Sequence, residues 1–310
     1  MQEIIIDFQK YSSLNIGCKL PVMVFEAADV GAYFINQDSQ NLIKQDMQIA
    51  KKPTIYTNTI LKFNKTLPHT NNAYLRLESA LDSMQWRIIG KANNLLVSPN
   101  ARNLAILGDS FNYISCNEDY IEIGASVNSL QAFLFFKKNN LCGLEFLKNL
   151  PGNIGALCNM NAGMKQYEMS QSLKSLNING EWIDLEQAKL LYRKRDSGGV
   201  IFAARFHKKL GFRYDLLPLF SQMRKTHPKD PSCGSCFKNP PNDYAGRLLE
   251  LVGMKGYFIN NVGFSMQHAN FLVNRGGAIY EDALRVIELA KEKVYNASGI
   301  RLECEVQICK

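Results

Sequence analysis

Residues 88–97 read IIGKANNLLV: an apolar run, a short turn rich in glycine and asparagine, and a second apolar run. Apolar runs on both sides of a turn predict two strands. Glycine and asparagine tolerate positive φ angles, so this turn can direct consecutive backbone N–H groups at an anion. The pattern is also typical of a simple β-hairpin, and these ten residues alone favour that interpretation. They contain neither the Gly-Lys-Ser/Thr of a Walker loop nor GxGxxG spacing.

Strands and helices alternate along the chain after this turn. Residues 104–107 and 120–123 are short apolar-rich runs that stop before a glycine, as strands do. Residues 126–139 change to helical spacing, with Leu130 and Leu134 among the apolar positions, and two asparagines end that helix. This interleaving predicts a fold of mixed α and β class.

A second mixed unit begins near residue 211. One helix is expected over 243–253, with Asp243 as its N-terminal cap and a glycine at its end. A longer helix is expected from about 281 to 299, where another glycine closes it. Residues 300–308 alternate apolar and polar side chains, which predicts a final strand.

The composition is that of an ordinary globular protein, with 46% apolar and 21% charged residues in a chain of 310, enough for two or three domains. The net charge of +8 is spread out, without a basic cluster interleaved with aromatics. Such a charge favours phosphate-bearing small molecules over nucleic acid. The amino terminus does not resemble a signal peptide, and no stretch has the roughly 18–20 apolar residues that span a bilayer. We therefore expect a cytoplasmic protein that binds neither nucleic acid nor membrane.

Eight cysteines are present, and Cys233 and Cys236 form the single CxxC pair. A structural zinc site usually needs a second pair or paired histidines at suitable spacing, and the four histidines here are scattered. We expect no metal site, and we interpret the cysteines as reduced structural thiols.

Residues 142–163 form a second stretch rich in glycine and asparagine. The small residues Gly152, Gly155 and Ala156 would let a ligand approach the backbone closely. They stand at an expected helix start, where free N–H groups favour an anionic or planar ligand. Because a loop of this composition loses much conformational entropy when it is ordered, a binding role is favoured over plain packing.

Residues 231–240, PSCGSCFKNP, place Ser235 after a glycine and close to a lysine and an asparagine. The pattern is not the GxSxG of a hydrolase elbow. A serine here could donate a proton if its neighbours stabilised the alkoxide. The segment alone nevertheless favours a turn hydroxyl that bonds its own backbone. On the polar face of the expected final strand, Glu303 and Glu305 are equally eligible for a catalytic role.

Taken together and in this order, these segments resemble the UDP-N-acetylenolpyruvoylglucosamine reductase family. The likeness covers nearly all of the chain outside residues 34–83, a polar stretch that we interpret as an insertion. Each motif is modest alone, but five in the right order are hard to obtain by chance. The matching segments are GKANNLLV at 90–97, LE at 144–145 with LPGNIG at 150–155 and NAG at 161–163, GSCFKNP at 234–240, HANFLVN at 268–274 and LECEV at 302–306.

The resemblance implies an α+β protein with an FAD-binding fold of the vanillyl-alcohol-oxidase (PCMH) type. Two α+β subdomains would hold the flavin, at residues 1–98, which include the polar insertion, and at 99–208. A C-terminal α+β substrate-binding domain would follow at 209–310. The chain resembles the shorter branch of the family, because it has no inserted tyrosine loop between Phe212 and Met223.

The resemblance also implies a reaction of cell-wall precursor synthesis. NADPH, as co-substrate, would reduce FAD, and the flavin would pass hydride to UDP-N-acetylglucosamine enolpyruvate to give UDP-N-acetylmuramate. By position, Ser235 would donate the proton, and Glu305 rather than Glu303 would be the second catalytic residue. The first loop contains no histidine or cysteine, which favours non-covalent FAD. We expect a monomer.

Other site residues follow from matched positions. Lys238 and Asn239 would lie near the substrate. Arg193 fits the spacing of the family's Tyr-Arg motif and would clamp the developing carboxylate charge, although Arg195 begins an Arg-Asp-Ser triplet that imitates another version of it. Residues 226–227 are Thr-His where many relatives carry Lys or Gln, so a ligand contact there stays open. The expected cofactor-binding residues are Gly90, Lys91, Ala92, Asn93, Asn94 and Leu95, followed by Pro151, Gly152, Ile154, Gly155, Asn161, Ala162 and Gly163.

Two other functions remain open from the sequence. Another flavin oxidoreductase of the same fold would oxidise an alcohol or a sugar with oxygen as acceptor. A non-catalytic nucleotide-sugar binding protein would be expected to have lost Ser235 or Glu305, and both are present.

Overall fold

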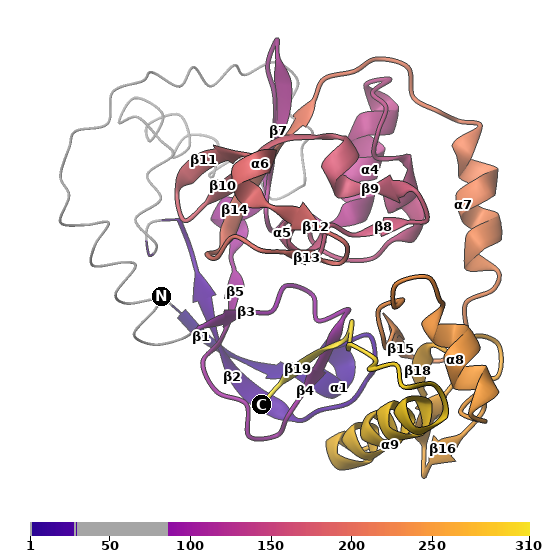
Figure 1. The fold of residues 1–310 in the computed structure, drawn as a ribbon. Coiled ribbons are helices and arrows are strands. Elements are labelled where there is room, and N and C mark those ends of the chain that lie inside the picture. Colours follow the sequence, from indigo (N-terminus) through magenta and orange to yellow (C-terminus); the bar gives the residue numbers. More distant parts are fainter. Residues whose placement is uncertain (1, 28, 30–85) are drawn as a thin grey trace.

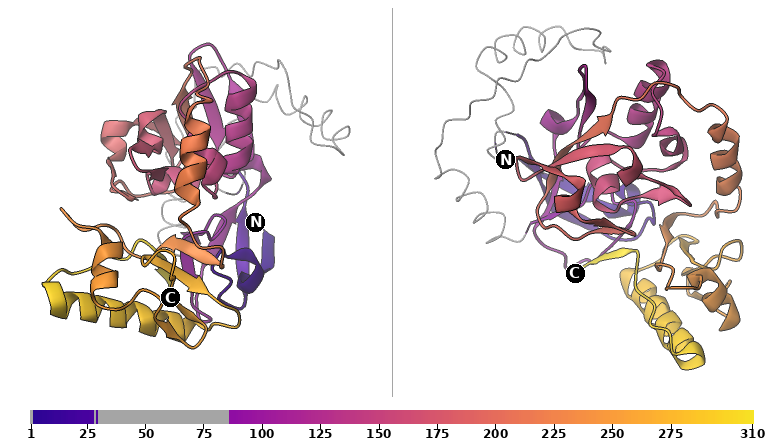
Figure 2. Two further views of the ribbon diagram at one scale, coloured as in Figure 1. Left: turned by 90° about the vertical axis from the view of Figure 1, so that its right-hand side faces the viewer. Right: turned by 45° about the horizontal axis from the view of Figure 1, so that its top comes forward.

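The computed structural model describes residues 2–27, 29 and 86–310, so the polar stretch 34–83 lies outside the described residues. These residues form a five-stranded sheet, two four-stranded sheets and smaller two-stranded ones. We call the three larger sheets, with their helices, the N-terminal, middle and C-terminal units. The middle unit lies on one side of the molecule, and the other two lie together on the opposite side (Figures 1 and 2).

The N-terminal unit is a four-stranded sheet whose first two strands are antiparallel and whose other pairs are parallel. The helix between the first two strands, α1 (Phe8–Tyr11), contributes the fully buried Phe8 to the core of this unit. The strand order is β1 (Gln2–Asp7), β2 (Lys19–Phe25), β5 (Leu104–Leu107) and β3 (Arg87–Ile88).

The two apolar runs around the 90–95 turn form strands, but these strands do not pair with each other. β3 pairs with β5, and the second run, β4 (Leu95–Val97), pairs in parallel with β19 (Gln307–Cys309). The hairpin interpretation is therefore wrong. The end of the chain returns to the N-terminal unit and provides the partner of β4 (Figure 1).

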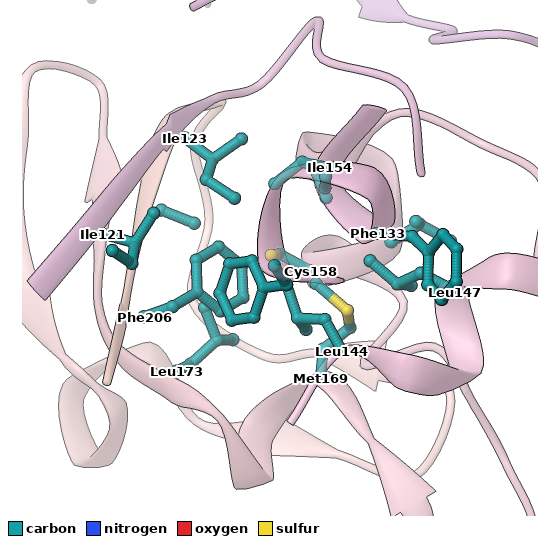
Figure 3. Packing of buried hydrophobic residues seen from close by; sticks show 14 of the residues in the cluster. Ile121, Ile123, Phe133, Leu144, Leu147, Ile154, Cys158, Met169, Leu173 and Phe206 are labelled. Carbon is teal, nitrogen blue, oxygen red and sulfur yellow. The ribbon is translucent and has the colours of Figure 1, made fainter. Parts of the chain in front are cut away.

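The middle unit is an antiparallel sheet packed against the helices α4 (Ser129–Lys138) and α5 (Ile154–Asn159). Figure 3 shows this core, in which Ile121 and Phe206 from the sheet lie near Cys158 from α5. The strand order is β11 (Glu181–Asp184), β10 (Leu173–Ile178), β14 (Ile201–His207), β7 (Tyr120–Gly124) and β6 (Ile114–Cys116).

The helix predicted over 126–139 is confirmed as α4, although it begins at Ser129. Asn128 caps it, because its Oδ1 accepts a hydrogen bond from the backbone N–H of Gln131 at 2.9 Å. Leu130 and Leu134 are 52% and 51% exposed, so the apolar spacing overstates the buried face.

The C-terminal unit is an antiparallel four-stranded sheet with the 19-residue helix α9 (Tyr280–Ser298) packed on its core. Gly299 ends this helix with a φ of +72°, as the sequence predicts. Helix α7 (Leu216–Arg224) leads into this unit from the middle one (Figure 1). The strand order is β15 (Ser232–Ser235), β18 (Phe271–Asn274), β17 (Val262–Phe264) and β16 (Phe258–Ile259).

The helix predicted from Asp243 is α8 (Ala245–Leu251), and Asp243 does not cap it. The Asp243 carboxylate accepts from the adjacent N–H of Tyr244 and pairs with Arg247. The N–H of Ala245 donates instead to Oδ1 of Asn239 at 3.1 Å. Asn239 therefore satisfies the first N–H of the helix.

Only the end of the predicted strand 300–308 is a strand. Cys304 forms an isolated bridge with Phe237 in the C-terminal unit, and β19 pairs in the N-terminal unit. Because the segment crosses from one unit to the other, it cannot pair with a single sheet along its length.

The eight cysteines are all free thiols. No helix in the described part of the chain is long and apolar enough to cross a membrane. The same part contains no group of three or more His, Cys, Asp or Glu side chains that could hold a metal ion. The remaining elements are η1 (Asp109–Phe111), η2 (Glu145–Asn149), β8 (Gly163–Met164), β9 (Tyr167–Glu168), η3 (Met169–Gln171), α6 (Leu185–Ala188), β12 (Leu190–Leu191) and β13 (Lys194–Arg195).

Candidate active site

A cavity of about 1780 Å³ is lined by residues of all three units. Every predicted site residue contributes to its wall except Ile154 and Asn161. The wall includes the 90–95 turn, residues 150–153, 162–165, 192–195 and 230–235, and the side chains of Lys238, Asn239 and Glu305.

The 90–95 turn has a backbone that few sequences can adopt. Gly90 and Ala92 have φ angles of +52° and +50°, a left-handed conformation that is unfavourable for alanine. The carbonyl groups of both residues are held by the end of α1 and the residues just after it. The Tyr11 hydroxyl donates to the Gly90 carbonyl at 2.5 Å, and the Ser13 N–H donates to the Ala92 carbonyl at 3.4 Å.

Among the described residues, the N–H of Ala92 donates to the Ile89 carbonyl at 3.1 Å, but three other N–H groups of the same turn have no protein acceptor. Within the described residues, none accepts from the N–H groups of Lys91, Asn93 or Asn94. Buried or cavity-lining N–H groups need an acceptor, and a turn that alternates left-handed residues directs such groups to one side. The turn therefore fits an anionic group such as a phosphate.

The second predicted loop is organised differently. The N–H groups of Ile154 and Gly155, at the start of α5, donate to the carbonyls of Val127 and Ala125 at 2.8 and 3.0 Å. The expectation that these two N–H groups are free for a ligand is therefore wrong. A Cβ added to Gly155 would lie 2.7 Å from the Cβ of Ala125, so glycine is needed there for packing within the protein.

Ile154 and Asn161 lie behind the cavity wall. Ile154 is fully buried in the core of the middle unit. Asn161 accepts from the N–H of Ser170 at 3.0 Å and donates to Glu168 at 3.0 Å. Both residues support the loop that brings Gly163 to the surface of the cavity.

Ser235 lies at a bulge between β15 and β18. Gly234 before it has a φ of +81°, and a Cβ added there would meet no atom within 4 Å, so the backbone angle alone calls for glycine. The hydroxyl that bonds the local backbone belongs to Ser232, which accepts from the Gly234 N–H at 3.0 Å. The Ser235 hydroxyl has no hydrogen-bond partner among the described residues, so the turn-hydroxyl interpretation is wrong.

The two glutamates that the sequence could not separate have different surroundings. The Glu303 side chain is 71% exposed and forms an ion pair with Lys238, whereas that of Glu305 is only 18% exposed. Burial raises the pKa of Glu305 to about 7, and the positive charges of Arg193 and Lys238 oppose that rise.

The two candidate arginines are separated by what they contact. Arg193, at the tip of the β12–β13 hairpin with a φ of +55°, places its Nε 3.4 Å from a carboxylate oxygen of Glu305. Its two Nη atoms donate to the carbonyls of Asn161 and Gly163, each at 3.2 Å. Arg195 instead bonds the carbonyls of residues 197–199 and the side chain of Asn159. Arg193 is therefore the arginine that contacts Glu305.

Comparisons with known proteins agree on one family. The model for the C-terminal domain of UDP-N-acetylenolpyruvoylglucosamine reductase matches residues 226–309. The chain is 47% identical over 308 residues to the UDP-N-acetylenolpyruvoylglucosamine reductase of Helicobacter hepaticus, covering 99% of each chain. It is 44% identical over 310 residues to that of Helicobacter pylori strain J99, covering 100% of each. The chain belongs to the UDP-N-acetylenolpyruvoylglucosamine reductase family.

A solved structure extends this likeness to the fold. The crystal structure of UDP-N-acetylenolpyruvylglucosamine reductase from Thermus caldophilus matches with a TM-score of 0.71 at 21% identity, covering 100% of both chains. The predicted α+β fold of the vanillyl-alcohol-oxidase type with a C-terminal α+β domain is thereby confirmed. Because the Helicobacter alignments cover 99% or more of the chain, those reductases share the 34–83 stretch with it.

The structure adds a residue to this reductase site that sequence reasoning did not assign. Asn270 is buried and clamps the segment after Ser235. Its carbonyl accepts from the Cys236 N–H at 2.7 Å, and its side chain bonds both the N–H and the carbonyl of Phe237, at 3.0 and 2.8 Å. The motif at 268–274 had marked the segment without giving any residue in it a role.

A second unassigned group lies at residues 224–227, where the sequence left a ligand contact open. The Nη1 of Arg224 lies 2.7 Å from Nδ1 of His227, and its Nε donates to the Asn149 carbonyl at 2.5 Å. Burial lowers the pKa of His227 to about 4, helped by the charge of Arg224. His227 is therefore neutral at pH 7, and Nδ1 accepts from Arg224. Both side chains line the cavity.

Proposed function

We propose that this chain reduces UDP-N-acetylglucosamine enolpyruvate to UDP-N-acetylmuramate, a peptidoglycan precursor, with bound FAD and with NADPH as co-substrate. Membership in the reductase family supports the reaction. The single observation that carries the proposal is that Ser235 and Glu305 line the same cavity as the 90–95 turn and the 150–163 loop.

The chain has residues suited to a non-covalent cofactor with phosphate groups. The N–H groups of the 90–95 turn would bind the phosphates, because the carbonyls of Gly90 and Ala92 are already bound and Lys91, Asn93 and Asn94 have free N–H groups within the described structure. Gly152 and Gly163 would let the rest of the cofactor approach the second loop. When bound, FAD supplies the redox chemistry, since it accepts hydride from NADPH and delivers it to the enolpyruvyl double bond.

Ser235 would act as an acid toward carbon. Arrival of hydride at one vinyl carbon places charge in the adjoining carboxylate system, and the other carbon must then receive a proton. The Ser235 hydroxyl is available to donate it, since it has no hydrogen-bond partner among the described residues. Asn270 fixes the backbone that follows Ser235, which helps to place the serine in the cavity wall.

Glu305 and Arg193 would act as a pair. With a pKa of about 7, the Glu305 carboxyl exchanges protons readily at neutral pH, as a catalytic acid or base must. Arg193 holds the carboxyl group from the side and joins it to the second loop through Asn161 and Gly163. Since three of its N–H groups face the protein, Arg193 would stabilise the charge of the reaction mainly through Glu305 and less by a bidentate clamp on substrate.

Lys238 and Asn239 would face the substrate from the C-terminal unit. Lys238 brings a positive charge near Glu305, as its influence on the pKa of that carboxyl indicates. The side-chain oxygen of Asn239 is bound by the start of α8, so the Nδ2 group is the part that would donate to substrate.

The domain bounds 1–98, 99–208 and 209–310 stay predictions, as do the monomeric state and the cytoplasmic location. Support for the bounds comes from the three separate sheets. The C-terminal bound is not strict, because β19, at the end of the chain, pairs with β4 and so contributes to the N-terminal unit.

The test of the proposed function is a visible spectrum of the purified protein. An absorption band at about 450 nm should bleach on adding NADPH in the absence of oxygen and recover on adding UDP-N-acetylglucosamine enolpyruvate. Absence of the band would refute the cofactor assignment. A band that bleaches with an alcohol or a sugar instead of NADPH, and recovers with oxygen, would favour a different flavin oxidoreductase.

A further inference from the structure

We propose that Asn94 is a positioning residue that ties the cofactor turn to the peptide of Glu305; this inference rests on the proposed function above. The Nδ2 of Asn94 donates to the Glu305 carbonyl at 2.9 Å. The Asn94 carbonyl accepts from the Gln307 N–H at 2.9 Å. The side chain and the backbone of one turn residue thus hold two neighbouring peptides of the C-terminal segment.

The other side of Glu305 is bonded to the segment that carries Ser235. The Glu305 N–H donates to the carbonyl of Cys236, the residue after Ser235, at 2.8 Å. The peptide groups of Glu305 therefore lie in a series of hydrogen bonds that joins the 90–95 turn to Cys236, the residue directly after β15. This series connects residues more than two hundred positions apart in the sequence.

The Glu305 segment depends on such contacts because it is not a strand. Residues 301–306 contain only the isolated bridge at Cys304, and β19 begins at Gln307. In the described structure, the backbone of residues 303–307 bonds Lys238, Cys236 and Asn94, and a segment outside a sheet is ordered by the few partners that it has. A second and longer contact, from the Gln307 side chain to the Glu305 carbonyl at 3.4 Å, is the weaker of the two side-chain bonds.

Because Asn94 lies in the turn, its hydrogen bond to Glu305 links that segment to ligand binding. Its own N–H is among those without an acceptor in the described part of the chain, on the turn that fits a phosphate. A ligand that orders the turn therefore also orders the segment of Glu305, and the coupling must act equally in the reverse direction. Cofactor occupancy prepares Glu305 for the step that uses it.

Asn93 is the matched control in the same turn. Its Oδ1 accepts from the Ser13 hydroxyl at 2.5 Å, in the segment after α1. Within the described part of the chain, its side chain makes no hydrogen bond to residues 303–309. Asn93→Ala removes a side chain of equal size from the turn and leaves the tie to Glu305 intact.

The first experiment measures backbone hydrogen exchange by mass spectrometry with and without saturating FAD. In the wild type, FAD should slow exchange in peptides that cover 303–310. In Asn94→Ala this protection should fall by about tenfold, as expected for the loss of one hydrogen bond. In Asn93→Ala the protection of 303–310 should remain. Equal protection in wild type and Asn94→Ala would overturn the proposal.

The second experiment separates the two half-reactions by stopped flow at saturating FAD. In Asn94→Ala, reduction of the flavin by NADPH should stay within about twofold of the wild type, while reoxidation by the enolpyruvyl sugar should slow by about tenfold. Equal slowing of both halves, or of neither, would overturn the proposal. If Asn94→Ala does not fold, Asn94→Ser, whose side chain is too short to reach Glu305, replaces it with the same expectations.

Different results would refute the proposed function and the proposed role of Asn94. If the wild type binds no FAD, or is not reoxidised by the sugar substrate, the proposed function is wrong. If the wild type does both and Asn94→Ala matches it in exchange and in both half-reactions, only the role of Asn94 is wrong.

Discussion

The 90–95 turn and the 150–163 loop have similar compositions but opposite hydrogen-bonding patterns. In the turn, the carbonyls are bound by Tyr11 and Ser13, and N–H groups remain available to a ligand. In the loop, the first N–H groups of α5 are bound by carbonyls of residues 125 and 127. Glycine and asparagine predict a tight backbone in both places. The two segments are told apart only by which of their backbone donors and acceptors already have partners within the protein.

The two regions meet at Glu305. The turn holds its backbone through Asn94. The loop holds its carboxylate through Arg193, which bonds the carbonyls of Asn161 and Gly163. The comparison therefore predicts that substitutions in the loop act mainly on packing and on the charge of Glu305, and those in the turn mainly on cofactor affinity.

The largest effect is expected at Gly163, in the loop. A Cβ there would lie 2.0 Å from the carbonyl oxygen of Tyr167, a backbone atom of the β8–β9 pair that cannot rotate away. We expect Gly163→Ala to lower the free energy of unfolding of the flavin-free protein by about 3 kcal/mol. Urea denaturation measures this. Gly198→Ala, where a Cβ would meet nothing within 4 Å, is the control and should stay close to the wild type. Equal stability of the two variants would contradict a packing role.

The next largest effect sets Gly155 against Gly90. Gly155→Ala places a Cβ 2.7 Å from that of Ala125 and should destabilise the flavin-free protein by about 2 kcal/mol. Gly90→Ala requires a left-handed alanine at φ +52°, at a cost of about 1 kcal/mol, and should mainly weaken FAD binding. Thermal unfolding and a fluorescence titration with FAD measure the two effects. If Gly155→Ala alone lost FAD affinity, the proposed difference between the loop and the turn would be contradicted.

The charge of Glu305 gives the third test. Because Arg193 opposes the raised pKa of about 7, Arg193→Gln should raise the pKa of Glu305 further. A higher pKa moves the midpoint of the pH profile of flavin reoxidation to higher pH, whichever protonation state is active. Reoxidation at pH 7 should also slow by about tenfold. Arg195→Gln is the control, since Arg195 bonds the carbonyls of residues 198 and 199 and not Glu305, and it should leave the midpoint in place. A shift in Arg195→Gln alone would reverse the assignment of the arginines.

The smallest effect is expected from Tyr11 behind the turn. Tyr11→Phe removes the donor to the Gly90 carbonyl and should weaken FAD binding by about fivefold, as the loss of one hydrogen bond does. Tyr113→Phe removes a hydroxyl of the middle unit that bonds Glu122 at 3.0 Å, so it should leave FAD affinity as it is. Fluorescence titration of both variants checks this. Equal losses would show that the effect is general destabilisation.

The local elements of this chain were readable from its sequence because they depend on neighbouring residues. The helix that Gly299 ends and the strand at 104–107 are where the patterns predict them. The hairpin around 90–95 was wrong because the partner of β4 is the chain terminus, a contact that no local pattern encodes. The strand over 300–308 was too long for the same reason, since the segment crosses between two units.

For the candidate site, the sequence predicted which residues lie together but not which groups contact one another. Order along the chain brought Ser235, Glu305 and the two loops together, and they do line one cavity. The side chain of Asn239 was expected on substrate, yet its oxygen serves helix α8. Asn270 and His227 entered only with the structure, because their roles depend on partners distant in sequence or on burial.

The central claim is that Ser235 protonates a carbon of the substrate in the cavity that also holds the flavin. Rapid mixing of Ser235→Ala with each substrate in turn tests it most directly. Reduction of the flavin by NADPH should proceed within about twofold of the wild-type rate, while reoxidation by UDP-N-acetylglucosamine enolpyruvate should slow by about 10²-fold or more. Reoxidation at the wild-type rate would contradict the claim.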